Sequence, residues 1–390
     1  MKLLLNVESM APPRTGIGNY TFHLLNELVQ SSLLEHIECF SGSDFIDAGV
    51  SLGVARQPIT EDNASAIALF SREIRLRLRH STMAYRILAA VRKMQFRNGV
   101  SGRTGFVYHE PAFVLRPYAG PSVVTIHDLS FINYPESQPR GRVDYLLREL
   151  PKTLRQADKI ITPSELIRQE LIGQLSVPPD QVVATSLGAS VDFQPRGDDQ
   201  CRSVLSNLGL KYRSYLLFVG TIEPRKNVSL LLDAWMSMPV LLRQRFPLVI
   251  AGAAGWCSDI LLRRLEAMAM TGGILYLSYV SEPELPFLYS GARAFIYPSI
   301  YEGFGLPVLE AMASGTPVIC TENTAMAEFS LGVAAFCGTS DVDRLKDLLI
   351  ELCEDADLAS DMGRRGRDAA TAFSWSRCAS ETMSVYASVL

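Results

Sequence analysis

Two glutamates in one glycine- and proline-containing stretch have the chemistry of a sugar-binding site. Glu302 and Glu310 are separated by seven residues, in the segment Y-P-S-I-Y-E-G-F-G-L-P-V-L-E-A-M-A-S-G-T-P-V-I. An ionised carboxylate only accepts hydrogen bonds, so a fixed glutamate suits the vicinal hydroxyls of a ribose or a hexose. Either glutamate alone is better explained as a solvated surface residue. Together, on both sides of a diphosphate site, they predict a clamp on a nucleotide sugar.

Proline and glycine predict the elements that position these two carboxylates. Pro307 suits the first position of a helix, where its missing N–H costs nothing, and Gly315 suits the residue that follows the helix. We therefore expect a strand at residues 293–297, a glycine-rich loop, a short helix and a strand at residues 316–320. The N-terminus of a helix presents unpaired N–H groups that favour a phosphate, and glycines let the backbone approach it.

The segment that begins at Glu302, E-G-F-G-L-P-V-L-E-A-M-A-S-G-T-P-V-I, closely resembles the signature of the retaining family 4 glycosyltransferases. The resemblance implies the α/β GT-B fold, two Rossmann-like doubly wound domains that face a central cleft. It also implies that Glu310 holds the ribose and Glu302 the hydroxyls of the transferred sugar. The backbone N–H groups of Phe304, Gly305 and Leu306 would face the diphosphate or sugar of the donor.

Length and composition agree with two globular domains in a reducing compartment. The chain has 390 residues, 48% of them hydrophobic and 20% charged, which predicts two domains of about 150–200 residues. A net charge of −4 gives no case for a nucleic-acid binder. The seven cysteines are scattered without a C-x-x-C pair, which argues against a zinc site or a disulfide framework. No run of 18 apolar residues predicts a transmembrane helix, and M-K-L-L-L-N-V reads as a first strand.

The domain boundary is expected at the polar stretch Arg196–Gln200. Residues 1–195 would form the acceptor-side domain and residues 196–375 the domain that binds the nucleotide sugar. F-S-W at residues 373–375 is typical of the family, whose final helix, here 376–390, crosses back to pack on the first domain.

Gly16 and Gly18 lie in a loop between an expected strand, residues 2–7, and an expected helix, residues 19–28. Phosphate-binding loops of doubly wound folds have this position. The third glycine of the dinucleotide fingerprint is missing, which disfavours a nicotinamide oxidoreductase, and a plain tight turn fits equally well. The family resemblance implies that both glycines face the diphosphate and the acceptor.

Residues 106–110 and 122–127 are largely apolar and read as parallel strands, and each has a histidine at its end, His109 and His127. Ligands of open α/β sheets bind beyond the carboxyl ends of the strands, so both are placed for a site. The run V-V-T-I-H-D-L-S-F is similar to the bacterial mannosyl- and rhamnosyltransferase branch, which implies that His127 is the active-site histidine. His109 is a candidate on the acceptor side.

The segment G-T-I-E-P-R-K-N, residues 220–227, follows another expected strand and matches the family pattern G-x-x-x-P-R-K-N. Arg225 can bind a diphosphate as a fork and Lys226 as a point charge. The alternative is an exposed turn with an ion pair to Glu223. Thr221 stands where many family members have an arginine, so its hydroxyl is the remaining donor at that position.

A basic amphipathic segment, residues 71–103, has two interpretations that both stay open. It can lie on an anionic membrane, or it can be a solvated helical face over a core. The D-x-D sequence at residues 355–357 reads as a helix cap rather than a metal site. The resemblance therefore implies an enzyme that needs no metal.

These patterns together predict a retaining hexosyltransferase of bacterial O-antigen or lipopolysaccharide assembly. The donor would be GDP-mannose or GDP-rhamnose, the acceptor a lipid-diphosphate-linked oligosaccharide, and the new linkage α. The enzyme would be cytoplasmic and peripheral on the inner face of the cytoplasmic membrane. The alternatives are a UDP-sugar-dependent transferase, a nucleotide-sugar epimerase or hydrolase on the same fold, and a non-catalytic scaffold that binds the nucleotide sugar.

Overall fold

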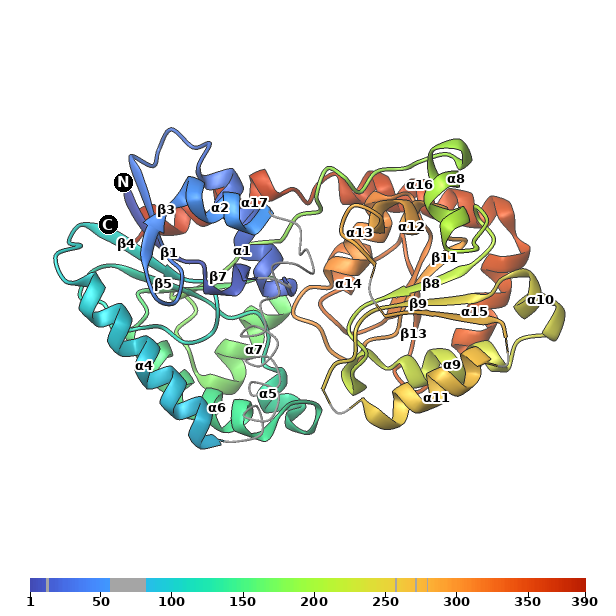
Figure 1. Cartoon of the computed structure of the whole chain (residues 1–390), viewed down its shortest axis with the longest axis horizontal. Helices are drawn as coiled ribbons and strands as arrows, with labels where there is room; N and C mark the ends of the chain where they lie inside the picture. The colour runs from blue at the N-terminus through green and yellow to red at the C-terminus, as the bar shows by residue number, and fades with distance from the viewer. Residues whose placement is uncertain (12–13, 57–81, 257, 271, 279) are drawn as a thin grey trace. The chain divides into compact units, whose positions relative to one another are not determined.

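The computed structural model describes residues 1–11, 14–56, 82–256, 258–270, 272–278 and 280–390. They divide into two compact units, each an α/β sandwich (Figure 1). Unit 1 comprises Met1–Leu187 and Trp375–Leu390, and unit 2 comprises Gly188–Ser374. We describe each unit by itself.

The sheet of unit 1 has seven described strands in the order β3-β2-β1-β4-β5-β6-β7. Neighbouring strands run parallel, except that β3 is antiparallel to β2. The central strands are buried along almost their whole length and apolar in their middle, as expected for a parallel sheet that is covered on both faces. The strands are β1 (Lys2–Asn6), β2 (His36–Phe40), β3 (Phe45–Asp47), β4 (Phe106–Glu110), β5 (Ser122–Thr125), β6 (Lys159–Thr162) and β7 (Val182–Ala184).

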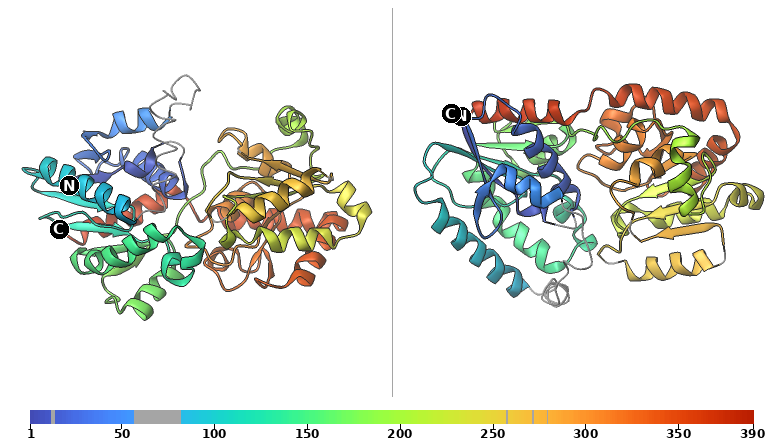
Figure 2. Two further views of the ribbon diagram at one scale, coloured as in Figure 1. Left: turned by 60° about the horizontal axis from the view of Figure 1, so that its bottom comes forward. Right: turned by 45° about the horizontal axis from the view of Figure 1, so that its top comes forward.

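Helices cover the sheet of unit 1, and the last helix of the chain is one of them. The helix α17 packs against α1, and Figure 2 shows the two side by side near the chain termini. The helices of unit 1 are η1 (Glu8–Met10), α1 (Gly16–Leu28), α2 (Ala48–Arg56), α4 (Thr82–Val100), α5 (Ser130–Asn133), η3 (Pro135–Ser137), α6 (Arg140–Gln156), α7 (Glu165–Leu175) and α17 (Trp375–Ala387).

The sheet of unit 2 has six described strands, all parallel to their neighbours, in the order β10-β9-β8-β11-β12-β13. The carboxyl ends of β8 and β11 are adjacent, which brings together the two segments that carry most of the predicted donor-binding residues. The strands are β8 (Leu216–Val219), β9 (Leu248–Ala251), β10 (Ile274–Leu277), β11 (Ala294–Tyr297), β12 (Val318–Thr321) and β13 (Ala335–Cys337).

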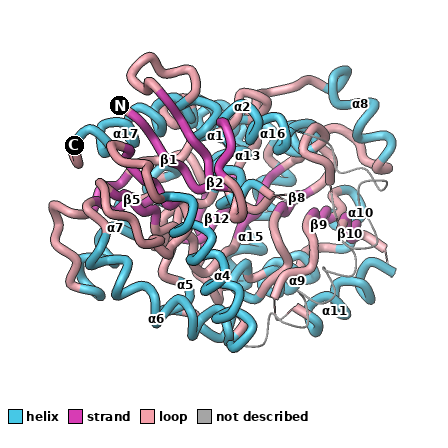
Figure 3. The backbone as a smooth tube through the Cα atoms, turned by 60° about the vertical axis from the view of Figure 1, so that its left-hand side comes forward, coloured by secondary structure: helices cyan, strands magenta, loops and turns pink. Residues whose placement is uncertain are grey.

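Figure 3 distinguishes the strands from the helices that flank them. In unit 2, α13 packs on α16 and α12 on α8, whereas α9 packs on α15. The helices of unit 2 are α8 (Asp198–Asn207), η4 (Pro224–Lys226), α9 (Val228–Met236), α10 (Val240–Arg245), α11 (Asp259–Met270), α12 (Leu285–Gly291), α13 (Leu306–Ala313), α14 (Ala327–Ser330), α15 (Val342–Glu354) and α16 (Ala356–Ala370).

The boundary between the units differs from the sequence-based expectation by eight residues, since unit 2 begins at Gly188 and not at Arg196. The reason is that the intervening segment is bonded to unit 2. The N–H of Ala189 donates to the carbonyl of Phe373, and the hydroxyl of Ser290 donates to the carbonyl of Gln194.

The short helix between the two glutamates is present, and the turn after it has the expected conformation. Pro307 is the second residue of α13, and Gly315 has a φ of 69°, which a side chain would strain. Asp355 caps α16 through its side chain, which accepts a hydrogen bond from the N–H of Leu358, as the helix-cap interpretation of D-x-D predicted.

Candidate active site

A cluster of buried charges joins the ends of β8 and β11 in unit 2. The ammonium of Lys226 donates to Glu302 Oε1 at 2.5 Å and to the hydroxyl of Tyr297 at 2.8 Å. The guanidinium of Arg225 lies 3.3 Å from Glu302 Oε2 and 3.0 Å from Glu223 Oε1. Two of the three ammonium hydrogens of Lys226 are thus used by described residues, which leaves one for a further acceptor.

Hydrogen bonds to the backbone also hold this cluster in place. The carbonyl of Arg225 accepts from the N–H of Ile300 and from the hydroxyl of Ser299, and the same hydroxyl lies 2.6 Å from Glu302 Oε1. Arg225 also donates to the carbonyl of Tyr301 at 2.6 Å. The turn η4 and the loop that carries Glu302 therefore form one hydrogen-bonded body.

Electrostatics explain why such a buried cluster is stable. Burial raises the pKa of Glu302, but the charges of Lys226 and Arg225 and the hydrogen bonds from Lys226 and Ser299 more than reverse this, to about 2. The pKa of Lys226 is lowered, mainly by burial and secondly by the charge of Arg225. Glu302 and Glu223 raise it, but by less. The carboxylate is therefore ionised at neutral pH, and the ammonium lies where additional negative charge would stabilise it.

Glu310 lies on α13 and has a different environment. Its Oε2 accepts a hydrogen bond of 3.0 Å from the hydroxyl of Tyr289 on α12, and no cation within the described residues forms an ion pair with it. Burial raises its pKa to about 7, partly offset by Tyr289 and reinforced by the charge of Glu282. A carboxyl group with a pKa near neutrality is typical of functional sites.

The loop before α13 presents its backbone because its side chains point into the core. Phe304 stacks on Phe329, with ring centroids 4.8 Å apart. Gly305 has a φ of 104°, and a Cβ there would lie 2.4 Å from Met326 Cγ, so only glycine fits. In the first turn of α13, Pro307 has no N–H, and the N–H groups of Val308 and Leu309 donate to the carbonyl of Gly305. The N–H of Leu306, the first residue of α13, has no acceptor inside the helix and is suited to an anion.

Thr221 is exposed at the end of β8, next to two glycines that follow β9. A Cβ at Gly252 would lie 1.9 Å from the carbonyl oxygen of Gly220, and one at Gly255 would lie 2.6 Å from Thr221 Cγ2. These glycines let the loop after β9 lie directly against the segment that leads to Arg225. The structure thus brings Thr221, Arg225, Lys226, Glu302 and α13 to one edge of one sheet.

The two glycines predicted to bind the donor in unit 1 are not in a loop. α1 begins at Gly16, three residues earlier than expected, so both glycines are helical. Gly18 is buried, and a Cβ there would lie 2.5 Å from the carbonyl oxygen of Ser9, which assigns it to helix packing. Gly16 is exposed at the N-terminus of α1 and has open space around it, so its proposed contact with a ligand stays a prediction.

His127 lies just beyond β5, and its ring is held by the main chain. Its Nε2 lies 2.7 Å from the carbonyl oxygen of Pro111, and the rings of Tyr20 and Phe113 meet it edge-on. A carbonyl only accepts, so Nε2 carries the proton, and in the neutral ring Nδ1 is an acceptor. Burial lowers the pKa of His127, which favours the neutral ring at pH 7, although Pro111 and Asp128 oppose this.

His109 does not have the position that an acceptor-side residue needs. It is fully buried, its Nδ1 lies 2.6 Å from the hydroxyl of Tyr386, and its Nε2 lies 2.8 Å from Thr125 Oγ1. Both ring nitrogens are therefore used inside unit 1. Strand position alone did not distinguish it from His127, because the partner Tyr386 belongs to the last helix of the chain.

Reasoning from the sequence missed several polar side chains around the predicted site residues. Ser299 and Tyr297 bind the Glu302–Lys226 pair, and Tyr289 binds Glu310. Ser299 and Tyr297 lie within five residues of Glu302, in Y-P-S-I-Y-E, so a hydroxyl close to a conspicuous carboxylate was the available signal.

The basic segment at residues 71–103 is described only in part, since residues 71–81, with Arg72, Arg75, Arg77 and Arg79, lie outside the described residues. The rest belongs to α4. There, Phe96 is buried in the core, whereas Ile87, Val91 and Met94 are exposed, 42–57%, on a surface that also carries Lys93 and Arg97. None of the described helices combines the length and apolar character needed to cross a bilayer.

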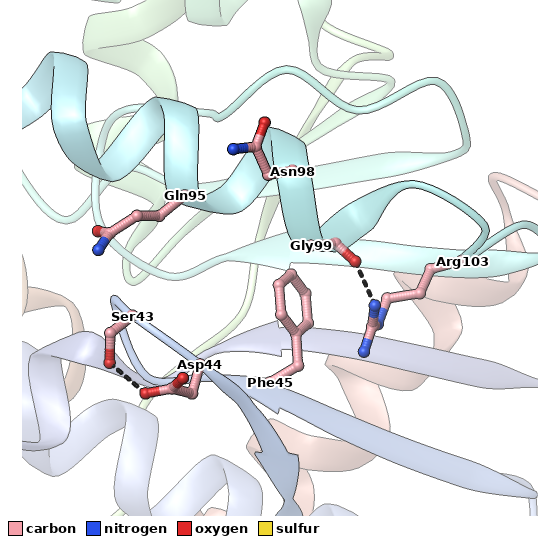
Figure 4. Close-up of a pocket in the computed structure, with 7 residues that line it drawn as sticks. All are labelled: Ser43, Asp44, Phe45, Gln95, Asn98, Gly99 and Arg103. Carbon is pink, nitrogen blue, oxygen red and sulfur yellow. Dashed lines mark hydrogen bonds between the residues drawn. The ribbon is translucent and has the colours of Figure 1, made fainter.

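Neither of two cavities in the described part of the chain contains a predicted site residue. One, of about 560 Å³, lies in unit 1 between the turn after β2 and the end of α4, lined by Asp44, Phe45, Asn98 and Arg103 among others (Figure 4). The other, of about 360 Å³, lies in unit 2 and is lined by four arginines, Arg213, Arg293, Arg364 and Arg367. No cluster of three His, Cys, Asp or Glu among the described residues could hold a metal ion, and metal independence stays a prediction.

Comparison with known proteins decides the family. The family model "Glycosyltransferase Family 4" matches residues 14–193, and the model "Glycosyl transferases group 1" matches residues 207–369. The chain is 34% identical over 386 residues to O-antigen chain mannosyltransferase B of Escherichia coli, an alignment that covers 99% of both chains. The chain belongs to glycosyltransferase family 4.

Solved structures agree on the fold of this glycosyltransferase. WaaG, a glycosyltransferase involved in lipopolysaccharide biosynthesis, has a TM-score of 0.71 at 14% identity, with 99% of both chains covered. Sucrose-phosphate synthase from Thermosynechococcus elongatus has a TM-score of 0.73 at 19% identity, with 100% of this chain and 98% of that chain covered. The fold is therefore the GT-B fold, as the sequence predicted.

The buried cluster predicts unequal losses when one of its partners is removed. Glu302→Gln leaves Lys226 facing Arg225 without a carboxylate between them, whereas Lys226→Met leaves Arg225 paired with Glu302. We expect both changes to lower the free energy of unfolding, by about 3–5 kcal/mol for Glu302→Gln and by less for Lys226→Met. Urea unfolding of the two variants and of the double variant measures this.

The double variant is expected to lose less stability than the sum of the single losses, by at least ~1 kcal/mol. Arg202→Met, in an exposed ion pair on α8, is the control and should leave the unfolding midpoint unchanged. Strictly additive losses in the double variant would show that Glu302 and Lys226 do not depend on each other.

The raised pKa of Glu310 predicts a pH-dependent stability with a defined sign. The folded state holds the proton up to about pH 7, whereas an unfolded glutamate releases it near 4.5, so unfolding becomes easier as the pH rises between these values. Glu310→Gln should remove this slope and make the protein more stable than the wild type at pH 8, by on the order of 2 kcal/mol. Thermal unfolding from pH 5 to pH 8 measures it, with the exposed Glu351→Gln as control. Parallel pH profiles of Glu310→Gln and the wild type would exclude burial of the carboxyl.

Proposed function

We propose that this glycosyltransferase moves a mannose from GDP-mannose to a lipid-linked glycan, with retention of configuration and an α linkage, in the assembly of an O-antigen or a related polysaccharide. GDP-rhamnose is the alternative donor within the same proposal. The similarity over 99% of both chains to an O-antigen chain mannosyltransferase supports this choice of sugar and pathway.

The observation that carries the proposal is the buried cluster of Lys226, Arg225 and Glu302 beside the N-terminus of α13. Two cations at one sheet edge, with the N–H groups of Phe304, Gly305 and Leu306 beside them, suit a diphosphate. In the proposal, Glu310 on the same helix accepts hydrogen bonds from the ribose. Ionised Glu302 pairs with both cations. Its contact with Arg225 through Oε2 is long, at 3.3 Å, so this oxygen can also accept a hydrogen bond from a sugar hydroxyl.

Catalysis in this proposal is mainly electrostatic. The bond between C1 of the sugar and the diphosphate oxygen breaks, and the negative charge that develops on the leaving diphosphate is stabilised by Arg225, Lys226 and the N–H groups of Phe304, Gly305 and Leu306. The acceptor oxygen forms its bond to C1 on the same face, and its proton passes to the leaving phosphate. Neutral His127 accepts a hydrogen bond from a sugar hydroxyl through Nδ1. No metal is needed for this scheme.

The exposed apolar side chains of α4, with Lys93 and Arg97 beside them, support a peripheral contact with an anionic membrane, where a lipid-linked acceptor would be found. The proposal therefore places the enzyme at the inner face of the cytoplasmic membrane. The assay described next can present the acceptor in anionic or in neutral vesicles, and the rate of GDP release is compared between the two.

A donor panel tests the proposal directly. GDP-mannose, GDP-rhamnose, UDP-glucose and UDP-N-acetylglucosamine are each incubated in EDTA, with and without a lipid-diphosphate glycan. We expect release of GDP that depends on the acceptor and falls at least a hundredfold in Glu310→Ala, with Glu351→Ala on α15 as the matched control.

Each other outcome of the panel removes part of the proposal. Release from UDP donors alone would assign a different donor. Turnover without acceptor would favour an epimerase or a hydrolase, and binding without turnover would favour a scaffold. Loss of activity in EDTA that Mg²⁺ restores would contradict a metal-independent reaction.

A further inference from the structure

A chain of four buried polar groups connects the last helix of unit 1 to the neighbourhood of His127. The hydroxyl of Tyr386 on α17 lies 2.6 Å from His109 Nδ1, and His109 Nε2 lies 2.8 Å from Thr125 Oγ1. Thr125 Oγ1 lies in turn 3.1 Å from the hydroxyl of Tyr20 on α1. All four residues are 0–1% exposed, so no solvent competes for these hydrogen bonds.

The same two strands carry a second, parallel connection two residues further on. His109 lies in β4 and Thr125 is the last residue of β5, whereas Pro111 and His127 lie just beyond these strands. His109 bonds to Thr125, and Pro111 accepts from His127. The second connection therefore joins the two residues that follow the strands carrying the first.

Tyr20 touches both connections. Its hydroxyl bonds to Thr125, and its ring meets that of His127 edge-on, at 80° and 5.0 Å between centroids. The same tyrosine contacts the ring of Trp375, the first residue of α17, which also stacks on His23 at 4.9 Å. The orientation of the His127 ring therefore depends on Tyr20, which α17 and Thr125 hold in place.

The groups in this chain are neutral at physiological pH, which suits a positioning role rather than proton transfer to solvent. Burial and the charge of His127 lower the pKa of His109 to about 3, so its ring stays neutral. Burial raises the pKa of Tyr386 and of Tyr20 well above that of a free phenol. Each of the four groups then has one hydrogen to donate. The three hydrogen bonds can therefore all run the same way along the chain of groups, each group donating to the next.

We propose that His109 is a positioning residue and that, with Tyr386, Thr125 and Tyr20, it holds the imidazole of His127 so that Nδ1 faces the reacting sugars. The packing of α17 on unit 1 thereby becomes a condition for transfer. This inference rests on the proposed function of His127, and it replaces the acceptor-side role that strand position had indicated for His109.

Conservative variants test whether these four groups position His127 or only stabilise unit 1. Tyr386→Phe removes one hydroxyl, Thr125→Val removes another without a change of shape, and Thr125→Ser retains it. Tyr118→Phe is the control, because its hydroxyl also donates to partly buried carbonyls of unit 1, those of Arg103 and Phe106, but, within the described part of the protein, forms no hydrogen bond with these four groups. Glycosyl transfer and the ring ¹⁵N signals of the histidines are measured for each full-length variant.

We expect Tyr386→Phe and Thr125→Val to lower kcat about tenfold to a hundredfold with little change in the KM of the donor. The ring signals of His127, assigned with His127→Ala, should shift toward a mixture of tautomers. Thr125→Ser and Tyr118→Phe should retain both the wild-type rate and the wild-type signals.

Two results would overturn the inference. The first is a rate in Tyr386→Phe and Thr125→Val equal to that of Tyr118→Phe. The second is a set of His127 signals that none of the changes affects. If the wild type transfers no sugar from any donor, the proposed function fails, but the ring signals still decide whether His109 positions His127.

Discussion

The structure of unit 2 depends on the neutralisation of one buried carboxylate. Glu302, Arg225 and Lys226 have side chains only 10–13% exposed, and each would cost several kcal/mol to bury alone. They are stable together because β8 and β11 are parallel neighbours, so that the segments after them end side by side. Ser299 adds a hydrogen bond to Glu302, and Tyr297 accepts one from Lys226. The sheet therefore supports two fixed cations where an anionic ligand can replace water.

The two units fix their candidate site residues through different interactions. Unit 2 holds its candidate residues through charge. The pKa of Lys226 is lowered, and that of Glu310 is raised to about 7. Unit 1 holds His127 through neutral hydrogen bonds and ring contacts, which fix a tautomer without creating a field. A glycosyltransferase needs both, since a diphosphate is bound by charge and a sugar hydroxyl by oriented acceptors.

Local signals in the sequence predicted local structure well, and distant partners could not be predicted. Pro307 and Gly315 act through their own backbone preferences, so the helix between them was expected at nearly its observed length. The partner of His109 lies 277 residues further along the chain, and the partner of Lys226 lies 76 residues away. Nothing in the strand pattern indicates either distance, which is why His109 was expected to face an acceptor. Gly18 was expected in a loop for a similar reason, whereas it lies in α1 with the carbonyl of Ser9 beside it.

The most direct test of the account measures how the buried cluster recognises a diphosphate. Calorimetric titration of the full-length wild type and Lys226→Met with GDP, UDP and guanosine compares the diphosphate with the nucleoside. The account predicts that the wild type binds one of the two diphosphates far more tightly than the nucleoside and that Lys226→Met loses at least about tenfold of that preference. Equal affinity of the wild type and Lys226→Met for the diphosphates would contradict it.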